Sequence, residues 1–203
     1  MSETVKKPAS KVGLRDVVWC LVTEDTAPDG ETAGVYATGE VKKLAGAIDA
    51  EMSNQNDEPD VQYFDDMEGD VLYPDPEITL TLEMADVDPA TAAELVGATV
   101  DNNGVTVNKA GDKAPYIAIG FKSVKSNGVD RYVWLYKGRC TIPSESYHTK
   151  EGEDITRQTE KLEITCIKRN KDANWRAYVD TDNKNFAAAK GTFFSAVYEP
   201  VTA

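Results

Sequence analysis

Residues 77–97 read EITLTLEMADVDPATAAELVG, a stretch that joins a one-sided strand directly to a capped helix. Apolar and polar side chains alternate through 77–85, which is the period of a strand with one buried face. The apolar positions are Ile78, Leu80, Leu82 and Met84, and the polar ones are Thr79, Thr81 and Glu83. We therefore predict a strand that packs one face on a core and turns the other face outward.

A helix is predicted immediately after this strand, over 88–96. Asp88 can cap its first turn, Pro89 suits its first position, and Gly97 can take the left-handed conformation that ends a helix. The residues between these signals are mostly good helix formers. The sequence thus predicts one flanking helix beside a strand-rich body.

Short strand-like segments fill most of the remaining chain. Asn103-Gly104 and Asn127-Gly128 are typical of tight hairpin turns, so the strands around each pair are expected to be antiparallel. The other predicted elements are strands at 16–23, 46–53, 98–100, 105–107, 115–125, 129–142, 159–169, 174–180 and 192–199, and a short helix at 183–190. This pattern indicates a single mainly β domain, an antiparallel β-sandwich or barrel-like fold with one flanking α-helix.

Two of these strands carry more specific expectations. Residues 16–23 are apolar on both faces, so they predict a central strand. Residues 46–53 alternate, which places Ile48, Ala50 and Met52 on one face and Asp49 and Glu51 on the other. The second strand therefore resembles 77–85 in having one apolar face and one acidic face.

Three segments are predicted to lie outside the strands. Residues 1–13 are polar and basic and are expected to form a flexible N-terminal arm. Residues 54–76 are rich in acids and contain three prolines, so we expect a long acidic loop. Residues 143–158 are predicted to form a polar loop, which contains the single histidine of the chain.

Charge is distributed unevenly along the chain. Residues 24–94 hold twenty acids and two bases, a local charge of 2 − 20 = −18, whereas the remainder holds fifteen acids and twenty bases, 20 − 15 = +5. The sum is the formal −13, which disfavours tight phosphate binding because that needs a basic face. Such asymmetry in a subunit favours head-to-tail association with copies of itself.

The residues offer little that suits catalysis or cofactor binding. Cys20, Cys140 and Cys166 are widely spaced inside apolar segments, which indicates buried thiols of a reducing cytosol, and the N-terminus has no apolar region typical of a signal peptide. His148 follows Ser144 in a polar loop, a poor setting for a rigid catalytic pair. We therefore predict no catalytic residue, no cofactor and no metal site.

Two weaker binding signals were weighed. Residues 180–185, DTDNKN, begin like a calcium loop but lack its glycine and have Lys184 at a ligand position, so a helix cap at Asp182 is preferred. Acids at 65, 66, 68 and 70 are better explained by a solvated segment than by a cation site. No glycine-rich phosphate-binding motif is present.

An aromatic strip at Tyr132, Trp134 and Tyr136 allows two interpretations. With a period of two, these rings share one face of a strand, where they can fill a core or a subunit interface. The same rings can instead form an exposed platform that stacks on sugars or bases. The second interpretation supports an alternative function, a monomeric carbohydrate-binding or adhesion module.

The chain resembles the major tail proteins, or tail tube proteins, of phages with long non-contractile tails, especially those of Gram-positive hosts. The residues that carry the resemblance cover most of the chain in order. They are Gly13–Trp19 (GLRDVVW), Gln62–Asp66 (QYFDD), Pro76–Gly97, Ala114–Phe121 (APYIAIGF), Asn127–Gly138 (NGVDRYVWLYKG) and Asn174–Arg176 (NWR).

This resemblance implies a β-sandwich subunit that assembles as a hexameric ring. The rings are expected to stack into a tube around a tape-measure protein, to meet tail-terminal proteins at the ends, and to conduct DNA to the host without binding it specifically. The family brings no catalytic residues. The protein is expected in the virion tail, after synthesis in the host cytoplasm, with no membrane partner.

Two sets of residues are assigned to such a tube as hypotheses. The polar strand positions Asp49, Glu51, Thr79, Thr81 and Glu83 are expected to face the lumen, where acids repel DNA. Contacts between rings are expected to join acids of the 54–76 segment either to bases near the N-terminus or to the strand ends near Arg131, Lys137 and Arg139. The acids are Asp65, Asp66, Glu68 and Asp70, and the bases are Lys6, Lys7 and Lys11.

Overall fold

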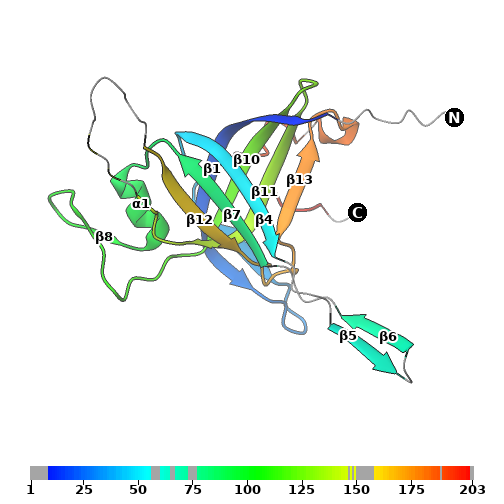
Figure 1. The fold of residues 1–203 in the computed structure, drawn as a ribbon. Helices are drawn as coiled ribbons and strands as arrows, with labels where there is room; N and C mark the ends of the chain where they lie inside the picture. Colours follow the sequence, from blue (N-terminus) through cyan, green and yellow to red (C-terminus); the bar gives the residue numbers. More distant parts are fainter. Residues whose placement is uncertain are drawn as a thin grey trace.

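The computed structural model describes residues 9–55, 60–64, 67–72, 77–145, 147, 149, 158–187 and 189–201. Over these residues the protein is mainly antiparallel β with one α-helix, as predicted (Figure 1). The main sheet runs in the order β2-β1-β10-β11-β12-β7-β4, with β13 beside β11 and β3 beside β1. Its strands are β1 (Lys11–Thr26), β2 (Val35–Thr38), β3 (Lys42–Lys43), β4 (Ala47–Gln55), β7 (Glu77–Met84), β10 (Ile117–Lys125), β11 (Asp130–Cys140), β12 (Glu160–Cys166) and β13 (Arg176–Asp180).

The sheet folds over on itself at β11. The first half of this strand pairs with β13, whereas its end, Gly138–Cys140, pairs with β12. As a result β12, β7 and β4 lie in front of β1, β10 and β11, so the sheet forms two layers (Figure 1). β4 comes close to β1 without pairing with it, so the folded sheet does not close into a barrel along this side.

The main core fills the space between the two layers. β7 contributes every second residue, with an alternating pattern of burial, and its apolar residues are at most 3% exposed. The core consists of residues from β1, β7, β10, β11, β12 and α1, among them Val17, Trp19, Ile78, Leu80, Leu82, Met84, Leu95, Ile117, Ile119, Val133, Leu135, Leu162 and Ile164. Burial of this apolar surface is the main stabilising contribution to the fold.

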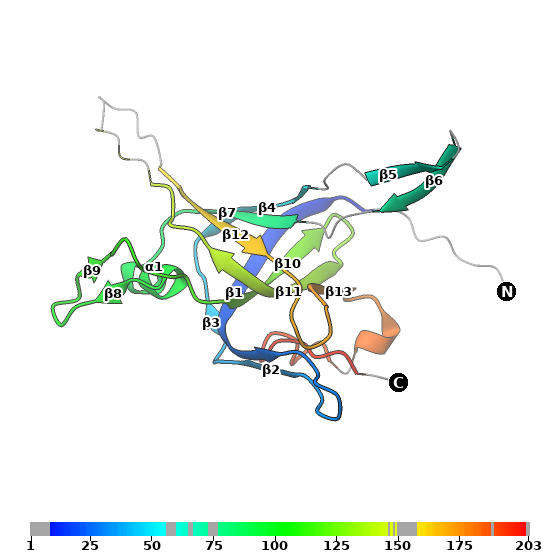
Figure 2. The same ribbon diagram turned by 90° about the horizontal axis from the view of Figure 1, so that it is seen from below.

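A second core lies on the outer side of β1, β10, β11 and β13. It contains Val18, Cys20, Ala118, Tyr132, Trp134, Tyr136, Phe186, Phe193 and Val197. β1 therefore contributes to both cores, which confirms it as a central strand buried on two faces. The chain after residue 183 covers this second core beside β2 (Figure 2).

The helix α1 (Pro89–Val96) forms with the predicted caps. The Asp88 carboxylate accepts a hydrogen bond from the Thr91 N–H at 3.2 Å, Pro89 is in the first turn, and Gly97 has a φ of 77°. Beyond Gly97, β8 (Thr99–Val100) and β9 (Thr106–Val107) make the expected small hairpin. Leu95 packs into the main core, so α1 flanks the sheet.

Two predicted segments outside the strands are corrected. Residues 54–76 are not one long loop, because β5 (Asp60–Phe64) and β6 (Met67–Leu72) form an antiparallel hairpin within them. Their Val, Tyr, Phe and Leu residues favour strands, and acids and prolines around them concealed that signal. The N-terminal arm is shorter than 1–13, since Lys11 already pairs with Lys125.

The C-terminal part departs most from expectation. The predicted strand 192–199 is wrong: residues 192–195 form turns and 196–199 are irregular, and the aromatic rings of this segment anchor it to the second core. The predicted helix at 183–190 is reduced to one 3-10 turn, η1 (Lys184–Phe186), which Asn183 caps in place of Asp182. Trp175 packs on the main core, opposite to Ala177 and Val179.

β4 carries an irregularity that alters its predicted faces. Its pairing with β7 shifts register between Ala47 and Asp49. Ala50 and Met52 still pack on the main core, but Ile48 is 54% exposed and Ala47 takes the inner position. A bulge of this kind reverses the side-chain alternation on one side of the extra residue.

Candidate functional site

A polar surface covers the outer face of β4, β7 and β12. These strands are adjacent and antiparallel, so their outward side chains line up in rows across the sheet. Three rows follow from the pairing, Asp49–Glu83–Lys161, Glu51–Thr81–Glu163 and Ser53–Thr79–Thr165. We refer to these nine residues as the polar face.

The alternation of the strands explains why the polar face exists. In β7 the residues between the polar ones are Ile78, Leu80, Leu82 and Met84, all of which are buried in the main core. β12 alternates in the same way, with Leu162, Ile164 and Cys166 inward. The polar face is thus fixed in place by a rigid core directly behind it.

Acidic residues dominate the charge of the polar face. It contains the four carboxylates of Asp49, Glu51, Glu83 and Glu163 and a single ammonium, that of Lys161, so its formal charge is 1 − 4 = −3. Thr159 donates a hydrogen bond to Glu83 at 2.7 Å, which orients that carboxylate. A surface of this charge repels phosphate and provides no basic groups arranged to hold it.

The structure brings together all five residues predicted to face a lumen. Asp49 lies opposite Glu83, and Glu51 lies opposite Thr81, on the same side of two paired strands. Sequence reasoning missed the contribution of Lys161, Glu163 and Thr165. Their alternation in β12 was visible, but nothing in the sequence showed that β12 pairs with β7.

The residues predicted to join rings are found in separate places or lie outside the described residues. Lys6, Lys7, Asp65 and Asp66 belong to the second group. Glu68 and Asp70 are on β6, and within the described chain β5 and β6 pair only with each other. Lys11 begins β1. The structure therefore does not join these residues within one subunit.

The aromatic strip is a core feature, so its interpretation as an exposed ligand platform is wrong. Tyr132, Trp134 and Tyr136 are at most 6% exposed. Trp134 donates a hydrogen bond from Nε1 to the Phe193 carbonyl at 2.8 Å, and Tyr136 donates one to the Tyr198 carbonyl at 2.9 Å. The strip holds the C-terminal segment, which removes the main support for a carbohydrate-binding module.

The three cysteines, the candidate reactive groups that the structure describes, do not form a reactive site. Cys20, Cys140 and Cys166 are free and buried, and burial raises the pKa of Cys140 and Cys166 to about 12 and that of Cys20 to about 11. These thiols stay protonated at neutral pH and are poor nucleophiles. Among the described residues no group of three His, Cys, Asp or Glu side chains is placed to hold a metal ion. His148 lies outside the described residues.

Two charged residues are buried among the described residues, Lys137 and Arg169, and each has an ion-pair partner. Lys137 donates a hydrogen bond to Asp25 at 2.6 Å, and both side chains are only 5% exposed. Burial opposes ionisation of Asp25, but hydrogen bonds from Lys137 and from the N–H groups of Asn170 and Lys171 lower its pKa overall. The pair therefore fastens the 169–171 turn to β1.

Comparison with known proteins adds one match to this geometry. A family model described as "Phage tail tube protein" matches residues 7–198 of the 203. A search of curated proteins found no match. In the part of the chain that the structure describes, no helix has the length and apolar character needed to cross a bilayer.

Proposed function

The chain belongs to the phage tail tube protein family, and from this premise we propose that its copies form hexameric rings that stack into a tube conducting DNA to the host. Membership makes it a structural protein of the virion tail. The observation that carries the finer proposal is the polar face, a rigid acidic surface backed directly by the main core. Such a surface suits the wall of a channel for a polyanion.

The polar face is proposed to line the lumen. Duplex DNA carries about one negative charge per 1.7 Å of its axis, so it binds readily to any protein surface that presents several Lys or Arg side chains. A wall bearing Asp49, Glu51, Glu83 and Glu163 repels the phosphates and lets the duplex slide. Thr79 and Thr81 add neutral polar groups between the acids. Hydration of these side chains keeps a water layer between wall and DNA.

The β5–β6 hairpin is proposed as a contact between successive rings. It projects from the body of the subunit on the side opposite to α1 (Figures 1 and 2). An isolated two-stranded hairpin is marginally stable in water, so a projecting one gains order from a partner surface. Its acids, including Glu68 and Asp70 with the neighbouring Asp65 and Asp66, complement basic groups on another copy. The basic N-terminal residues Lys6, Lys7 and Lys11 are included among them as a hypothesis.

The remaining roles follow from assembly. The subunit is proposed to act without catalysis, since its cysteines are buried and protonated. Its partners are other copies of itself, a tape-measure protein inside the tube and tail-terminal proteins at its ends. Synthesis is proposed to take place in the host cytoplasm, before the tail is built.

Electron microscopy of the purified protein tests the proposal directly. We expect rings or tubes in negative stain. In size-exclusion chromatography the protein should elute earlier than a monomer, at a higher apparent mass. A reconstruction should then place Glu51 and Glu163 on the inner wall. A protein that stays monomeric at high concentration contradicts the assembly, and these carboxylates on the outer surface contradict the assignment of the lumen.

A further inference from the structure

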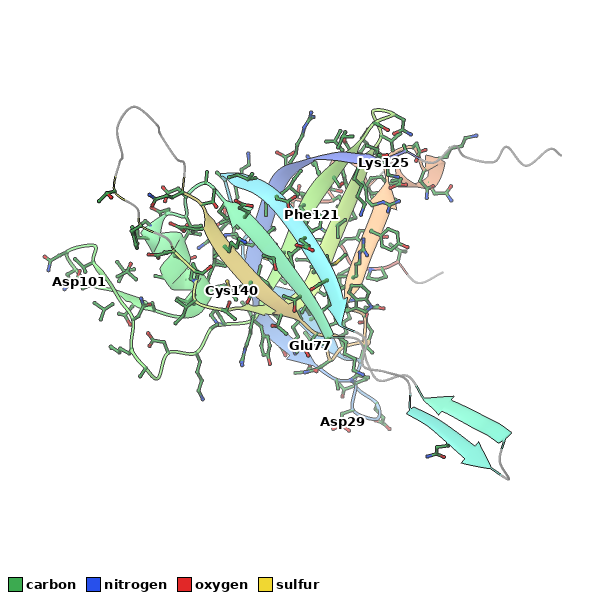
Figure 3. All side chains as sticks on the ribbon, viewed as in Figure 1. Asp29, Glu77, Asp101, Phe121, Lys125 and Cys140 are labelled. Carbon is green, nitrogen blue, oxygen red and sulfur yellow. The ribbon has the colours of Figure 1, made fainter. Side chains whose placement is uncertain are left out.

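A cavity of about 420 Å³ opens where β4 approaches β1 without pairing. Phe121 of β10, labelled in Figure 3, lies at this opening. Its lining combines an apolar floor with basic groups, and the residues that matter here are Lys11, Ile48, Met52, Phe121, Val133 and Arg176. Asp49 also lines the rim. The cavity thus exposes part of the main core beside a cluster of positive charge.

Arg176 is the unusual group in this cavity. Its Nε is buried and has no hydrogen-bond partner, and no ion pair joins it to another described residue. Burial lowers the pKa of its guanidinium, and the charge of nearby Arg131 lowers it further. A buried donor without an acceptor costs free energy that a partner would recover.

Arg131 lines the same cavity and, unlike Arg176, has a carboxylate partner. Its Nε and Nη2 donate to the two carboxylate oxygens of Asp180 at 2.7 and 3.0 Å. Lys125 donates to that carboxylate as well, at 2.5 Å, so Asp180 already serves two cations. Arg176 instead lies over two aromatic rings, with Cζ 4.4 Å from the centroid of Tyr178 and 5.8 Å from that of Trp175. Among the described residues, Arg176 is therefore a planar cation without a carboxylate partner.

We propose that this cavity is the docking site for the β5–β6 hairpin of a second copy of the chain, with a hairpin carboxylate as the partner of Arg176. The inference rests on the proposed assembly and names the receiving surface. The hairpin carries both chemistries that the cavity needs, aromatic residues at Tyr63 and Phe64 and acids at Glu68 and Asp70. A ring fills the apolar floor while a carboxylate meets the guanidinium.

The position of the hairpin favours a second copy over the same one. Ile48 and Met52 of β4 both line the cavity, and the hairpin follows the end of that strand after Gln55. At about 3.3 Å per residue, Gln55 is roughly 10 Å along the strand from Met52 and roughly 23 Å from Ile48. The hairpin also points away from the body (Figure 1). A hairpin that points outward and a cavity on a different surface of the subunit make a heterologous contact between two copies, which propagates as a stack.

Crosslinking between two populations of subunits tests this contact. One population carries Gln62→Cys on β5 and the other carries Ile48→Cys at the cavity; both positions are exposed, and the native cysteines are buried. After mixed assembly, a short bis-maleimide should give a covalent dimer that contains one copy of each. Val107→Cys on β9, 43% exposed and away from the cavity, is the control and should give none.

A charge reversal supplies the second readout. Arg176→Glu should slow tube growth and reduce the crosslink at least tenfold, whereas Lys109→Glu, the same change at a distant exposed site, should leave both within twofold. Tubes that form at the normal rate without the crosslink overturn this inference and leave the proposed function intact. Ile48→Cys that crosslinks only to itself or to Val107→Cys also overturns it. A wild type that forms neither rings nor tubes defeats the proposed function itself.

Discussion

Arg169 Nη1 lies 2.5 Å from Glu199 Oε1, which ties the turn after β12 to the end of the described chain. The Arg169 side chain is completely buried, and it also pairs with Asp172. Its guanidinium lies over the rings of Tyr36 and Tyr136, with Cζ at 4.7 and 4.2 Å from the centroids. A single cation thus holds β2, β11 and the C-terminal segment together over the second core.

Loss of this cation should destabilise the subunit strongly. Arg169→Ala leaves Asp172 without a cation and Glu199 with Lys171 alone, and it removes the ring contacts. Breaking a buried pair costs about 3–5 kcal/mol, and because Asp172 and Glu199 are partly exposed we expect about 2–3 kcal/mol. Urea unfolding measures the change. Arg139→Ala, whose exposed guanidinium lies over Tyr116, should cost less than about 1 kcal/mol, and equal losses would contradict the assignment.

The same cluster should make stability sensitive to acid. The Arg169 hydrogen bond lowers the pKa of Asp172 from 3.8 to about 2. A carboxyl with a lowered folded pKa stabilises the protein above its unfolded pKa, and that contribution disappears as the pH falls from about 4 to about 2. Asp172→Asn should therefore reduce stability at neutral pH and flatten the curve within that window. Glu94→Gln, at an exposed site on α1, serves as the control for thermal unfolding across the pH range.

The orientation of β7 predicts opposite tolerance at alternate residues. Leu82→Asp places a charge in the main core beside Leu162 and Ala50, at a cost of several kcal/mol against a typical total of ~5–15. The subunit should then be insoluble or unfolded. Thr79→Asp, on the polar face beside Ser53 and Thr165, should remain folded. Expression in soluble form and circular dichroism distinguish the two, and a soluble, folded Leu82→Asp protein would show that the faces are reversed.

Contact between β10 and β11 depends on a residue without a side chain. A Cβ at Gly120 would lie 2.9 Å from two ring atoms of Trp134 and 3.0 Å from Phe194. Gly120→Ala must displace these rings, and overpacking of this kind costs about 1–3 kcal/mol. Gly111→Ala meets nothing within 4 Å and should be nearly neutral. Thermal unfolding compares the two; a Gly120→Ala protein as stable as the wild type would show that the second core can relax around the added methyl group.

Some elements of this structure could be predicted from the sequence alone, and others could not. β7 and α1 were predictable because their signals are local, namely a strict alternation, a capping aspartate and a C-terminal glycine. Local alternation also explains why Asp49 and Glu51 share one side of β4, and why Thr79, Thr81 and Glu83 share one side of β7, whereas the pairing of these two strands is a distant contact. The folding of the sheet at β11 and the approach of β4 to β1 depend on distant pairing, which no local pattern encodes.

Other features escaped prediction because competing signals concealed them. The β5–β6 hairpin has strand-forming residues, but the acids and prolines around it suggested a loop. The final aromatic segment has the composition of a strand, yet it is held by ring contacts and by bonds from Trp134 and Tyr136. The unpartnered Arg176 could not be recognised at all, since its significance depends on which carboxylates the fold places elsewhere.

Salt should slow the docking of subunits more than it affects their folding. Charges at the rim of an interface chiefly affect association rate and register, and screening removes their effect beyond about 8–10 Å at physiological ionic strength. If the acidic hairpin docks on basic groups of another copy, tube growth should slow as salt rises, while apolar contacts keep finished tubes intact. Asp65→Lys with Asp66→Lys should slow growth further and leave the unfolding midpoint unchanged, because the flanking strands β5 and β6 contribute no described residue to either core. Asp29→Lys with Glu31→Lys makes the same change in charge in the exposed turn before β2 and should have little effect.

Light scattering across a salt series, for the wild type and both double variants, measures the rate of tube elongation. Rates that respond to neither salt nor the hairpin substitutions would mean that the acids keep a concentrated protein soluble and do not guide its assembly.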